Sequence, residues 1–349
     1  MDTRANKLSE LIRTRPAMFI GNLKFTGFAN MLEFVLEEML TEINLETTIE
    51  IEFLQSNTIR LHARHVNTSG LMNCIFHLDH ADMQQTDSLP VAILISLSVA
   101  AEIEVHHQEE VYTLDSKQGD YILNKAPGKG NAGTLLVEFT PDPLIFHDFE
   151  ADYEQTNVLL QKIACLYPGV KIISSDLRGD HCRNVFHYPQ GITRLLDNAI
   201  ATHPHASPFF RLDLKAVIRD YAYQVSFCYQ PLWITTSYVR SFANHYELFL
   251  GGSLIEGVQE GIIMAIRDAA AKAKTKIRIS KRKLLESMVV IAAVRGKEFE
   301  LTGPGKWKLD APALKMDIKR YVFAEVARYL SLHAEDRNRV ILNFADEFE

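Results

Sequence analysis

The sequence predicts an α+β protein of two domains, each with helices packed on a largely antiparallel sheet. Three observations carry this prediction. In the first half, an amphipathic helical pattern over residues 30–43 is followed by strand patterns. In the second half, a further set of strand patterns is broken by one long helical pattern and ends with another. Near residues 190–205, Gly191 and the run 201–208 form a turn-rich link between the two sets. A chain of 349 residues can bury two separate cores.

The first half of the chain reads as one helix followed by strands. Met31, Phe34 and Val35 begin an i, i+3, i+4 pattern that predicts an amphipathic helix over residues 30–43. The apolar stretch 89–105 is too short to span a bilayer, and it predicts a buried helix leading into a strand. Alternation of apolar and polar residues predicts strands over residues 48–53, 58–63, 71–78, 102–114 and 134–139.

The second half contains further strands and longer helices. A helix over residues 150–166 and a strand over 170–174 complete the first domain. A boundary in the turn-rich link gives domains at residues 1–200 and 201–349. In the second domain we expect strands over residues 209–218, 222–228, 233–239 and 288–294, and helices over 254–274 and 315–333.

Composition excludes several classes of protein. The net charge of −7 argues against nucleic-acid binding by the whole surface. A chain with this net charge can still carry a local basic patch that binds nucleic acid. The four cysteines form no C-x-x-C pair, the N-terminus is too polar for a signal peptide, and no membrane span is predicted. We therefore expect a cytoplasmic protein. No metal site is predicted, because the following histidines and cysteine lack metal-ligand spacing: His106, His107, His181, Cys182, His203 and His205.

Seven short motifs are spread over nearly the whole chain. They are Arg-Thr-Arg-Pro-Ala-Met-Phe-Ile-Gly at 13–21, Gly-Thr-Leu-Leu-Val-Glu-Phe-Thr-Pro-Asp at 133–142, Pro-Gly-Val-Lys-Ile at 168–172, Phe-His-Tyr-Pro-Gln-Gly-Ile at 186–192, Ser-Phe-Ala-Asn at 241–244, Gly-Gly-Ser-Leu-Ile-Glu-Gly at 251–257 and Gly-Pro-Gly-Lys-Trp-Lys-Leu at 303–309. In this order they resemble the ATPase and transducer region of the DNA gyrase B and topoisomerase IV B proteins, in the GHKL superfamily. One such motif is weak, whereas seven in family order are specific.

The resemblance implies a GHKL-type helix-on-antiparallel-sheet ATPase domain followed by a ribosomal S5-like transducer domain. An active member would use Mg-ATP. The partners it implies are DNA, a second copy of the chain, and a protein partner such as a separately encoded topoisomerase-like subunit.

In this family, a general base and a Mg²⁺-binding Asn lie four residues apart on the first helix, so they share one side of it. A register anchored on Thr26 places Phe34 at the base and Glu38 at the Asn. A register shifted by one residue places Glu33 at the base and Glu37 at the Asn. The apolar pattern favours the first register, in which Phe34 cannot accept a proton. The three glutamates also fit a solvated helix face.

The nucleotide-binding loops depart from the family pattern. The adenine-reading acid is expected at Asp79, after a strand over 74–78, but His80 and Asp82 replace the glycines that follow it in the family. The phosphate loop is expected at residues 87–92, which contain no glycine to fold the amides around phosphate. A G-x-G-x-x-G match at 128–133 precedes a strand instead of a helix, and we interpret it as a hairpin turn.

The motif at 303–309 is the best-preserved ATP-handling element. Its family counterpart carries a lysine that reaches the γ-phosphate, and Lys306 stands at that position, with Lys308 at a second nucleotide-binding position. A lysine in a Gly-Pro turn is also an ordinary surface residue.

Residues 272–283 contain seven basic residues and no acid. In the family the transducer lines a cavity through which DNA passes, so the resemblance implies salt-dependent phosphate contacts here. A solvated helix end is the alternative. The candidate DNA-binding residues are Lys272, Lys274, Lys276, Arg278, Lys281, Arg282 and Lys283.

The altered loops favour a degenerate, hydrolysis-incompetent relative that acts as a binding or regulatory protein and needs no cofactor. The alternative is an ATP-dependent dimerising clamp with Glu33 as base and Lys306 on the γ-phosphate, working with a separate topoisomerase-like partner. An intermediate case binds nucleotide without hydrolysing it.

Overall fold

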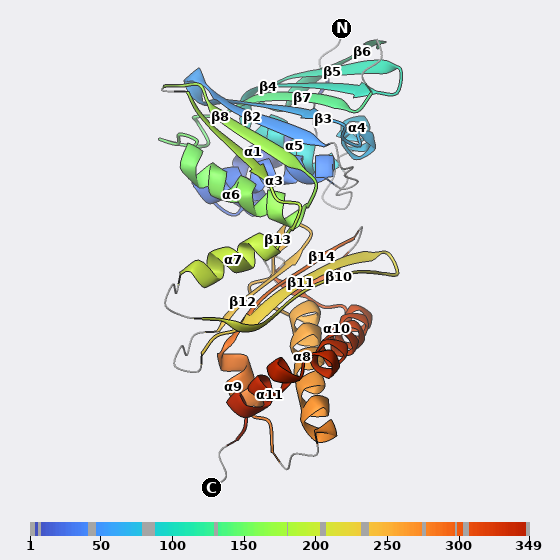
Figure 1. Cartoon of the computed structure of the whole chain (residues 1–349). Helices are drawn as coiled ribbons and strands as arrows, with labels where there is room; N and C mark the ends of the chain where they lie inside the picture. The colour runs from blue at the N-terminus through green and yellow to red at the C-terminus, as the bar shows by residue number, and fades with distance from the viewer. Residues whose placement is uncertain are drawn as a thin grey trace. The chain divides into compact units, whose positions relative to one another are not determined.

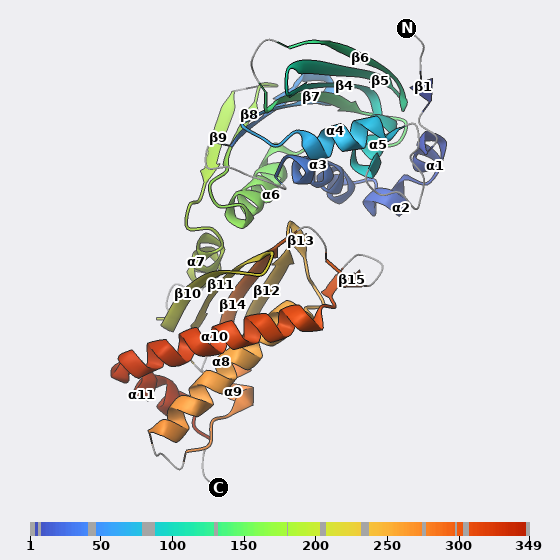
Figure 2. The same cartoon turned by 90° about the vertical axis from the view of Figure 1, so that its right-hand side faces the viewer.

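The structure is a computed structural model that describes residues 4–5, 8–40, 47–78, 88–128, 132–179, 181–202, 207–231, 237–273, 277–296, 299–302 and 307–346. The chain divides into two compact units, residues 1–189 and 190–349, and each is described by itself (Figures 1 and 2). Helix α7 (Thr193–Ala201) belongs to the second unit, whereas a boundary at residue 200 would assign it to the first.

The first unit is built on a nine-stranded sheet in the order β1-β6-β5-β4-β7-β3-β2-β8-β9. Neighbouring strands are antiparallel except β2 and β8, which are parallel. Every second residue of β2 and β3 is buried, as the alternating pattern predicts. The strands are β1 (Arg4–Ala5), β2 (Thr48–Leu54), β3 (Thr58–Arg64), β4 (Ser98–His107), β5 (Glu110–Lys117), β6 (Asp120–Pro127), β7 (Thr134–Pro141), β8 (Lys171–Asp176) and β9 (Cys182–His187).

Helices α3, α5 and α6 cover one side of this sheet (Figures 1 and 2). Their apolar residues supply one layer of the core, and the inward residues of the strands supply the other. Asp152 caps α6 by accepting a hydrogen bond from the amide of Gln155 at 2.9 Å. The helices of the first unit are α1 (Ser9–Thr14), α2 (Pro16–Ile20), α3 (Phe25–Leu40), α4 (Ser69–Phe76), α5 (Leu89–Ser96) and α6 (Tyr153–Leu166), with a 3₁₀ turn at Gln55–Asn57.

The second unit has a five-stranded sheet in the order β10-β11-β14-β12-β13 and a two-stranded sheet of β15 and β16. Helices α8 and α10 pack on one face of the larger sheet, and α7 lies on the other (Figure 1). The elements are β10 (Phe209–Ile218), β11 (Tyr221–Tyr229), β12 (Tyr238–Ala243), β13 (Tyr246–Glu247), α8 (Ser253–Lys272), α9 (Lys281–Glu286), β14 (Met288–Arg295), β15 (Leu301–Thr302), β16 (Lys308–Leu309), α10 (Pro312–Leu332) and α11 (Ala334–Asn343).

Several strands and helices lie where the sequence predicts them. Strand β10 has the predicted bounds, and α5 leads into β4 as expected for the apolar stretch 89–105. Helix α3 begins earlier than predicted, at Phe25. The last predicted helix ends near His333, but a further helix, α11, follows it.

Three predictions about the first unit are wrong. Residues 71–78 are not a strand, because Ser69–Phe76 forms α4 with Leu71, Met72 and Ile75 buried at helical spacing. Residues 102–114 belong to two strands, β4 and β5, joined by a turn in which Gln108 has a φ of 56°. The glycine-containing segment 128–133 is not a hairpin turn, because it connects β6 and β7, which are separated in the sheet by β5 and β4.

Candidate functional site

Helix α3 carries the candidate catalytic positions. Its apolar face is buried, and Glu33, Phe34, Glu37 and Glu38 are half-buried. Because successive helical residues are rotated by about 100°, Glu33 and Glu37 lie on one flank and Phe34 and Glu38 on the other. The two sequence registers therefore point to different flanks of α3.

The flank with Glu33 faces helix α6. The ammonium group of Lys162 on α6 donates to Oε1 of Glu33, in an ion pair whose side chains are 20% and 11% exposed. The two residues of this pair, which links α3 to α6, are 129 positions apart in sequence. The structure thus gives Glu33 a structural partner.

The flank with Phe34 and Glu38 faces helix α4. A Cβ atom placed on Gly70 would lie 2.8 Å from Oε2 of Glu38, so this carboxylate lies against the start of α4. Helix α5 also packs on α3. Of the two flanks of α3, the one with Phe34 and Glu38 is therefore the one next to α4.

The expected adenine site is only partly described. Asp79 lies outside the described residues, and the segment before it is helix α4, so the premise that Asp79 follows a strand is wrong. The strand that pairs with β2 in antiparallel fashion is β3, which ends at Arg64 and is followed by His65 and Val66. No acidic side chain therefore directly follows this strand among the described residues.

The expected phosphate loop leads into α5. Asp87 lies outside the described residues, and the helix starts with Leu89 and Pro90. Val91 and Ala92 in its first turn are buried, with 1% and 0% of their surface exposed. Neither position is a glycine, the residue that lets a backbone approach a phosphate group closely.

The transducer-type lysines belong to the second unit. Lys306 lies outside the described residues, and Lys308 is exposed on β16, where it pairs with Thr302 of β15. The neighbouring Leu309 is buried and its backbone pairs with Gly251, so the strand position of Lys308 is fixed.

The basic segment 272–283 spans the end of α8 and the start of α9. Lys274 and Lys276 lie outside the described residues. The other charges are partly neutralised by acids outside the segment: Lys272 pairs with Asp268, Arg278 with Asp346, and Arg282 with Glu286. The hydrogen bond from Arg282 to Glu286 raises the pKa of the Arg282 guanidinium. Lys281 is exposed, and the ammonium group of Lys283 donates to the carbonyl of Ala345 at 2.9 Å.

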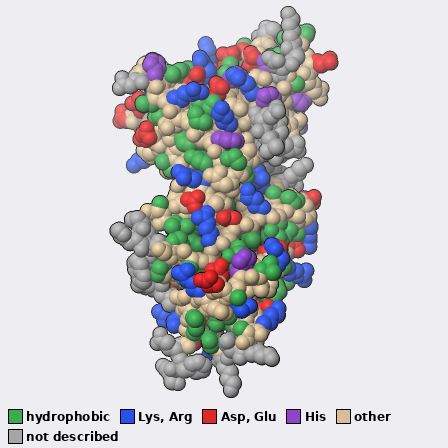
Figure 3. Space-filling view, in the orientation of Figure 1, with side chains coloured by type: hydrophobic (Ala, Val, Ile, Leu, Met, Phe, Trp, Pro, Cys, Tyr) green, Lys and Arg blue, Asp and Glu red, His purple; other side chains and the backbone are tan. Residues whose placement is uncertain are grey.

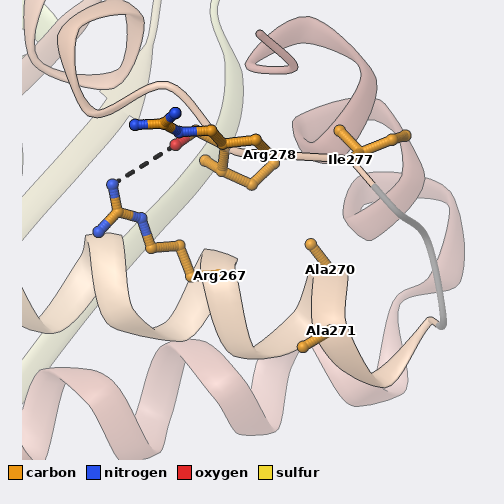
Figure 4. A pocket seen from close by; sticks show the side chains of 6 residues that line it. Arg267, Ala270, Ala271, Ile277 and Arg278 are labelled. Carbon is orange, nitrogen blue, oxygen red and sulfur yellow. Dashed lines mark hydrogen bonds between the residues drawn. The ribbon is translucent and has the colours of Figure 1, made fainter.

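A pocket of about 420 Å³ opens beside this segment (Figure 4). Its wall comes from α8, through Arg267, Ala270 and Ala271, and from residues 277–279. The guanidinium of Arg267 donates to the carbonyl of Ile279 at 3.5 Å, so α8 and the segment are held together across the pocket. Arg267 and Arg278 contribute two positive charges to the lining, which suits an anionic ligand.

The wider surface carries both signs of charge. On the face shown in Figure 3, Lys and Arg side chains are interspersed with Asp and Glu. Among the described residues, no group of three or more His, Cys, Asp and Glu is arranged to hold a metal ion. No helix in the described part of the chain has the length and apolarity needed to cross a bilayer.

Sequence reasoning missed three residues that shape these sites. Lys162 is the lone cation in the apolar pattern of α6, which is a detectable signal, but its pairing with Glu33 is visible only in three dimensions. Arg267 lies just outside the basic segment. Asp346 is distant in sequence from Arg278, and no local pattern connects the two.

The comparisons with known proteins agree with this architecture. Residues 191–348 match the family described as DNA gyrase B. The DNA gyrase B protein of Mycoplasma genitalium is 22% identical, over 95% of this chain and 57% of its own length, and that of Campylobacter jejuni is 24% identical, over 92% and 44%. The chain thus spans about half the length of the curated relatives that it matches.

The matches to solved structures extend over the residues of both units. The 43K ATPase domain of Thermus thermophilus gyrase B, in complex with an aminocoumarin, has a TM-score of 0.79 and 17% identity, and the match covers 97% of this chain and 94% of that one. The topoisomerase IV ATP-binding domain of Francisella tularensis has a TM-score of 0.78 and 16% identity, with 98% and 96% covered. The chain is therefore gyrase B-like, similar in sequence to the gyrase B and topoisomerase IV B proteins, and it has the fold of their ATPase and transducer region.

Proposed function

We propose that this chain is a degenerate gyrase B-like protein that does not hydrolyse ATP and acts by binding DNA, a partner protein or a second copy of itself. The observation that carries the proposal is the arrangement on α3. The flank next to α4 offers Phe34 at the position of a base, and the carboxylate of Glu33 lies on the other flank and is bonded to Lys162.

Hydrolysis needs a group that accepts a proton from water attacking the γ-phosphate. A phenylalanine cannot do this. Glu38, four residues along on the same flank, would add a negative charge near the phosphates, which repels them unless a cation lies between. Buried Val91 and Ala92 at the start of α5 further support loss of the phosphate cradle.

The alternative is an ATP-dependent clamp that works with a separately encoded topoisomerase-like partner. It is favoured by the likeness to solved ATPase domains along nearly their whole length. In this case Mg-ATP binds, Glu33 leaves Lys162 and acts as the base, and Lys306 reaches the γ-phosphate.

Titration calorimetry with a non-hydrolysable ATP analogue and Mg²⁺ tests the proposal, together with an ATP turnover assay. We expect no turnover above background in the wild type. Steady turnover that Glu33→Gln abolishes would establish the clamp. Binding without turnover would identify a nucleotide-regulated binding protein, and no binding would identify a vestigial site.

For DNA contact, we propose the basic segment 272–283 with Arg267. The exposed position of Arg278, whose side chain is 88% accessible, supports this. Binding should weaken steeply with salt, because phosphate contacts release counterions. Fluorescence anisotropy with a short duplex at several salt concentrations measures the slope. A flat salt dependence would argue against phosphate contacts.

A further inference from the structure

Strand β9 forms one edge of the nine-stranded sheet of the first unit. It pairs with β8, and no other strand in the described part of the chain pairs with it (Figure 2). The six residues of β9 pair with β8 in one continuous register without a bulge. On the inner side of the sheet, Phe186 is buried, and the side-chain amide of Asn184 donates to the hydroxyl of Tyr153 on α6 at 3.1 Å. β9 is therefore a regular edge that contacts with α6 hold in place.

The hydrogen bonds of β8 show which backbone groups of β9 face outward. The amides of Lys171 and Leu177 donate to carbonyl groups of the β2 segment at 3.0 and 2.9 Å, so the odd-numbered residues of β8 bond to β2. The even-numbered residues of β8 bond to β9, where they lie opposite even-numbered residues. The N–H and C=O groups of the odd-numbered residues of β9, Arg183, Val185 and His187, therefore point away from the sheet.

The other sheet edges in the described ranges are protected. β1, β13, β15 and β16 are each two residues long. β10 has a register shift between Phe209 and Leu212, and the hydroxyl of Tyr321 donates to the carbonyl of its Lys215 at 2.8 Å. Short length, irregular register and cover are the usual ways of keeping an edge from pairing with another chain. β9 has none of them, and its one permanent charge, that of Arg183, opposes only the addition of a basic strand.

The side chains along this edge are apolar at the centre and basic around it. Val185 is 51% exposed and lies opposite Ile173 of β8. Arg183 and His187, two residues before and after Val185, are exposed on the same face of the sheet, as is Lys171 opposite His187. Neither Arg183 nor Lys171 forms an ion pair with another described residue. The edge therefore carries positive charge that is not neutralised locally.

The acids on the two neighbouring strands do not supply that charge balance. Glu50 and Glu52 of β2 pair with arginines of β3, and Asp176 of β8 pairs with Arg178. A segment that adds to β9 would thus meet free cations and no free carboxylate from β2 or β8. This distribution is complementary to an acidic segment.

We propose that β9 binds an extended acidic segment of a partner protein, which adds to the sheet as a further strand. The backbone of the segment bonds to the outward N–H and C=O groups of β9. An apolar residue of the segment lies beside Val185, and acids two positions before and after it lie beside Arg183 and His187. The pattern acid-x-apolar-x-acid reads the same in both directions, so it suits parallel and antiparallel addition. This inference rests on the proposed function as a binding protein and names the class of its partner.

The test uses the full chain and a capped, fluorescently labelled peptide. The peptide has about ten residues, the length of a long strand, and is centred on Glu-Thr-Val-Thr-Glu. Anisotropy at low salt compares it with a peptide that carries Lys in place of both Glu. We expect the acidic peptide to bind about tenfold more tightly, because each exchange turns attraction into repulsion. Equal binding of the two peptides, or binding of neither, would overturn the proposal.

Two variants separate the backbone contribution from the charge. Val185→Pro removes one outward N–H group and leaves the bonds to β8 in place, since proline is accepted where the N–H of an edge strand faces away from the sheet. Binding should weaken about tenfold or more. Arg183→Glu should remove or reverse the preference for the acidic peptide. Thermal unfolding by circular dichroism checks that both are folded, and Arg183→Glu decides if Val185→Pro is not.

Lys117→Glu is the matched control for charge. Lys117 is exposed on β5, which lies between β4 and β6 and so is not an edge strand. The substitution changes the net charge as much as Arg183→Glu does, and it should leave the preference for the acidic peptide unchanged. A loss of preference as large as that of Arg183→Glu would show that the peptide responds to overall charge and not to β9.

Amide hydrogen exchange locates the bound segment. In the free protein, the amides of Cys182, Asn184 and Phe186 bond to β8 and should exchange slowly, whereas those of Arg183 and Val185 should exchange fast. The acidic peptide should slow exchange at Arg183 and Val185 about tenfold or more and leave the other three unchanged. Binding that leaves Arg183 and Val185 unprotected would place the peptide on another surface and overturn the proposal.

The inference and the proposed function fail in different ways. If the acidic peptide does not bind and the chain does not turn over ATP, β9 is not the partner site, and the proposed loss of hydrolysis stands. If the peptide protects β9 and the chain hydrolyses ATP, the edge is a partner site on an active enzyme, and the proposed function fails instead.

Discussion

At the scale of single residues, Asp142 is a buried carboxylate whose side chain is 1% exposed. Nη2 of Arg13 donates to it at 2.7 Å, and Nη1 of Arg13 donates to the carbonyl of Ser96 at 2.7 Å. Without Arg13, the buried charge loses its cation, which costs about 3 kcal/mol. We expect Arg13→Met to lower the free energy of unfolding of the first unit by about 3 kcal/mol in urea at pH 7.

The pH dependence of this effect follows from the pKa of Asp142. Burial raises that pKa, but hydrogen bonds from Arg13 and from the amide of Leu144 outweigh burial and hold the pKa below its ordinary value. Stabilisation by the ionised group is complete above the unfolded pKa, roughly 4, and is lost as pH falls through the lower folded pKa. The difference in free energy of unfolding between the wild type and Arg13→Met should therefore become smaller below pH about 4.

An exposed pair is the control for this prediction. Arg328 and Glu325 are bonded on the surface of α10, and Arg328→Met should hardly move the urea midpoint. If Arg328→Met lowers the free energy of unfolding as much as Arg13→Met does, burial of the pair is not the reason for the loss of stability. If the difference in free energy of unfolding between the wild type and Arg13→Met stays constant down to pH 3, the charge of Asp142 is not what Arg13 stabilises.

The pair of Glu33 and Lys162 is also testable at this scale. Each single variant, Glu33→Gln or Lys162→Met, leaves a half-buried group without its partner, whereas the double variant removes both. We expect a coupling energy of about 1–3 kcal/mol in a double-mutant cycle measured by urea unfolding. The exposed pair Glu110 and Lys125 should show almost no coupling. No coupling between Glu33 and Lys162 would leave Glu33 free for catalysis.

At the scale of elements, α8 and α10 pack closely through glycines. A Cβ atom on Gly261 would lie 2.8 Å from the carbonyl oxygen of Lys319 and 3.0 Å from Cβ of Val322. Alanine normally stabilises a helix by about 1 kcal/mol relative to glycine, but forcing these helices apart costs about 1–3 kcal/mol. We expect Gly261→Ala to destabilise the second unit in thermal unfolding.

The matched control is a helical glycine whose nearest neighbour is the end of a side chain instead of the backbone. A Cβ atom on Gly70 in α4 would meet the end of the Glu38 side chain, which can rotate away. Gly70→Ala should therefore be neutral or stabilising by up to about 1 kcal/mol. If Gly261→Ala is stabilising to the same degree, the close packing of α8 and α10 is not what requires glycine.

The elements that the sequence predicts well are those whose own periodicity decides the structure. β10 alternates from Arg211 to Ile218, whereas the apolar residues of α4 allow either period over a short run, and the sequence therefore predicts a strand there. The turn at Gln108 escapes prediction because a non-glycine residue adopts a positive φ.

The sites are less predictable than the fold because their contacts are long-range. The sequence identifies the carboxylate of Glu33 and the cation of Arg278. Their partners, Lys162 and Asp346, are 129 and 68 residues away, and tertiary packing alone brings them together.

At the scale of the whole molecule, the second unit has its own core, made of residues between Phe209 and Phe344. Helix α7 covers the opposite face of the sheet. Its residues Leu195 and Leu196 are buried, and the hydroxyl of Thr193 donates to Asp213 of β10 at 2.9 Å. We therefore expect residues 190–349 to fold alone with a single cooperative urea transition.

A shorter fragment tests where the unit begins. Residues 202–349 lack α7 and would expose the apolar face that includes Val289 and Ile291 of β14. We expect this fragment to be less stable than residues 190–349 by about 3 kcal/mol or more, or to aggregate. Leu196→Ala in the full chain tests the same contact and should cost about 2–5 kcal/mol in the transition of the second unit. Equal stability of the two fragments would place α7 with the first unit, because its packing on β14 would then contribute nothing.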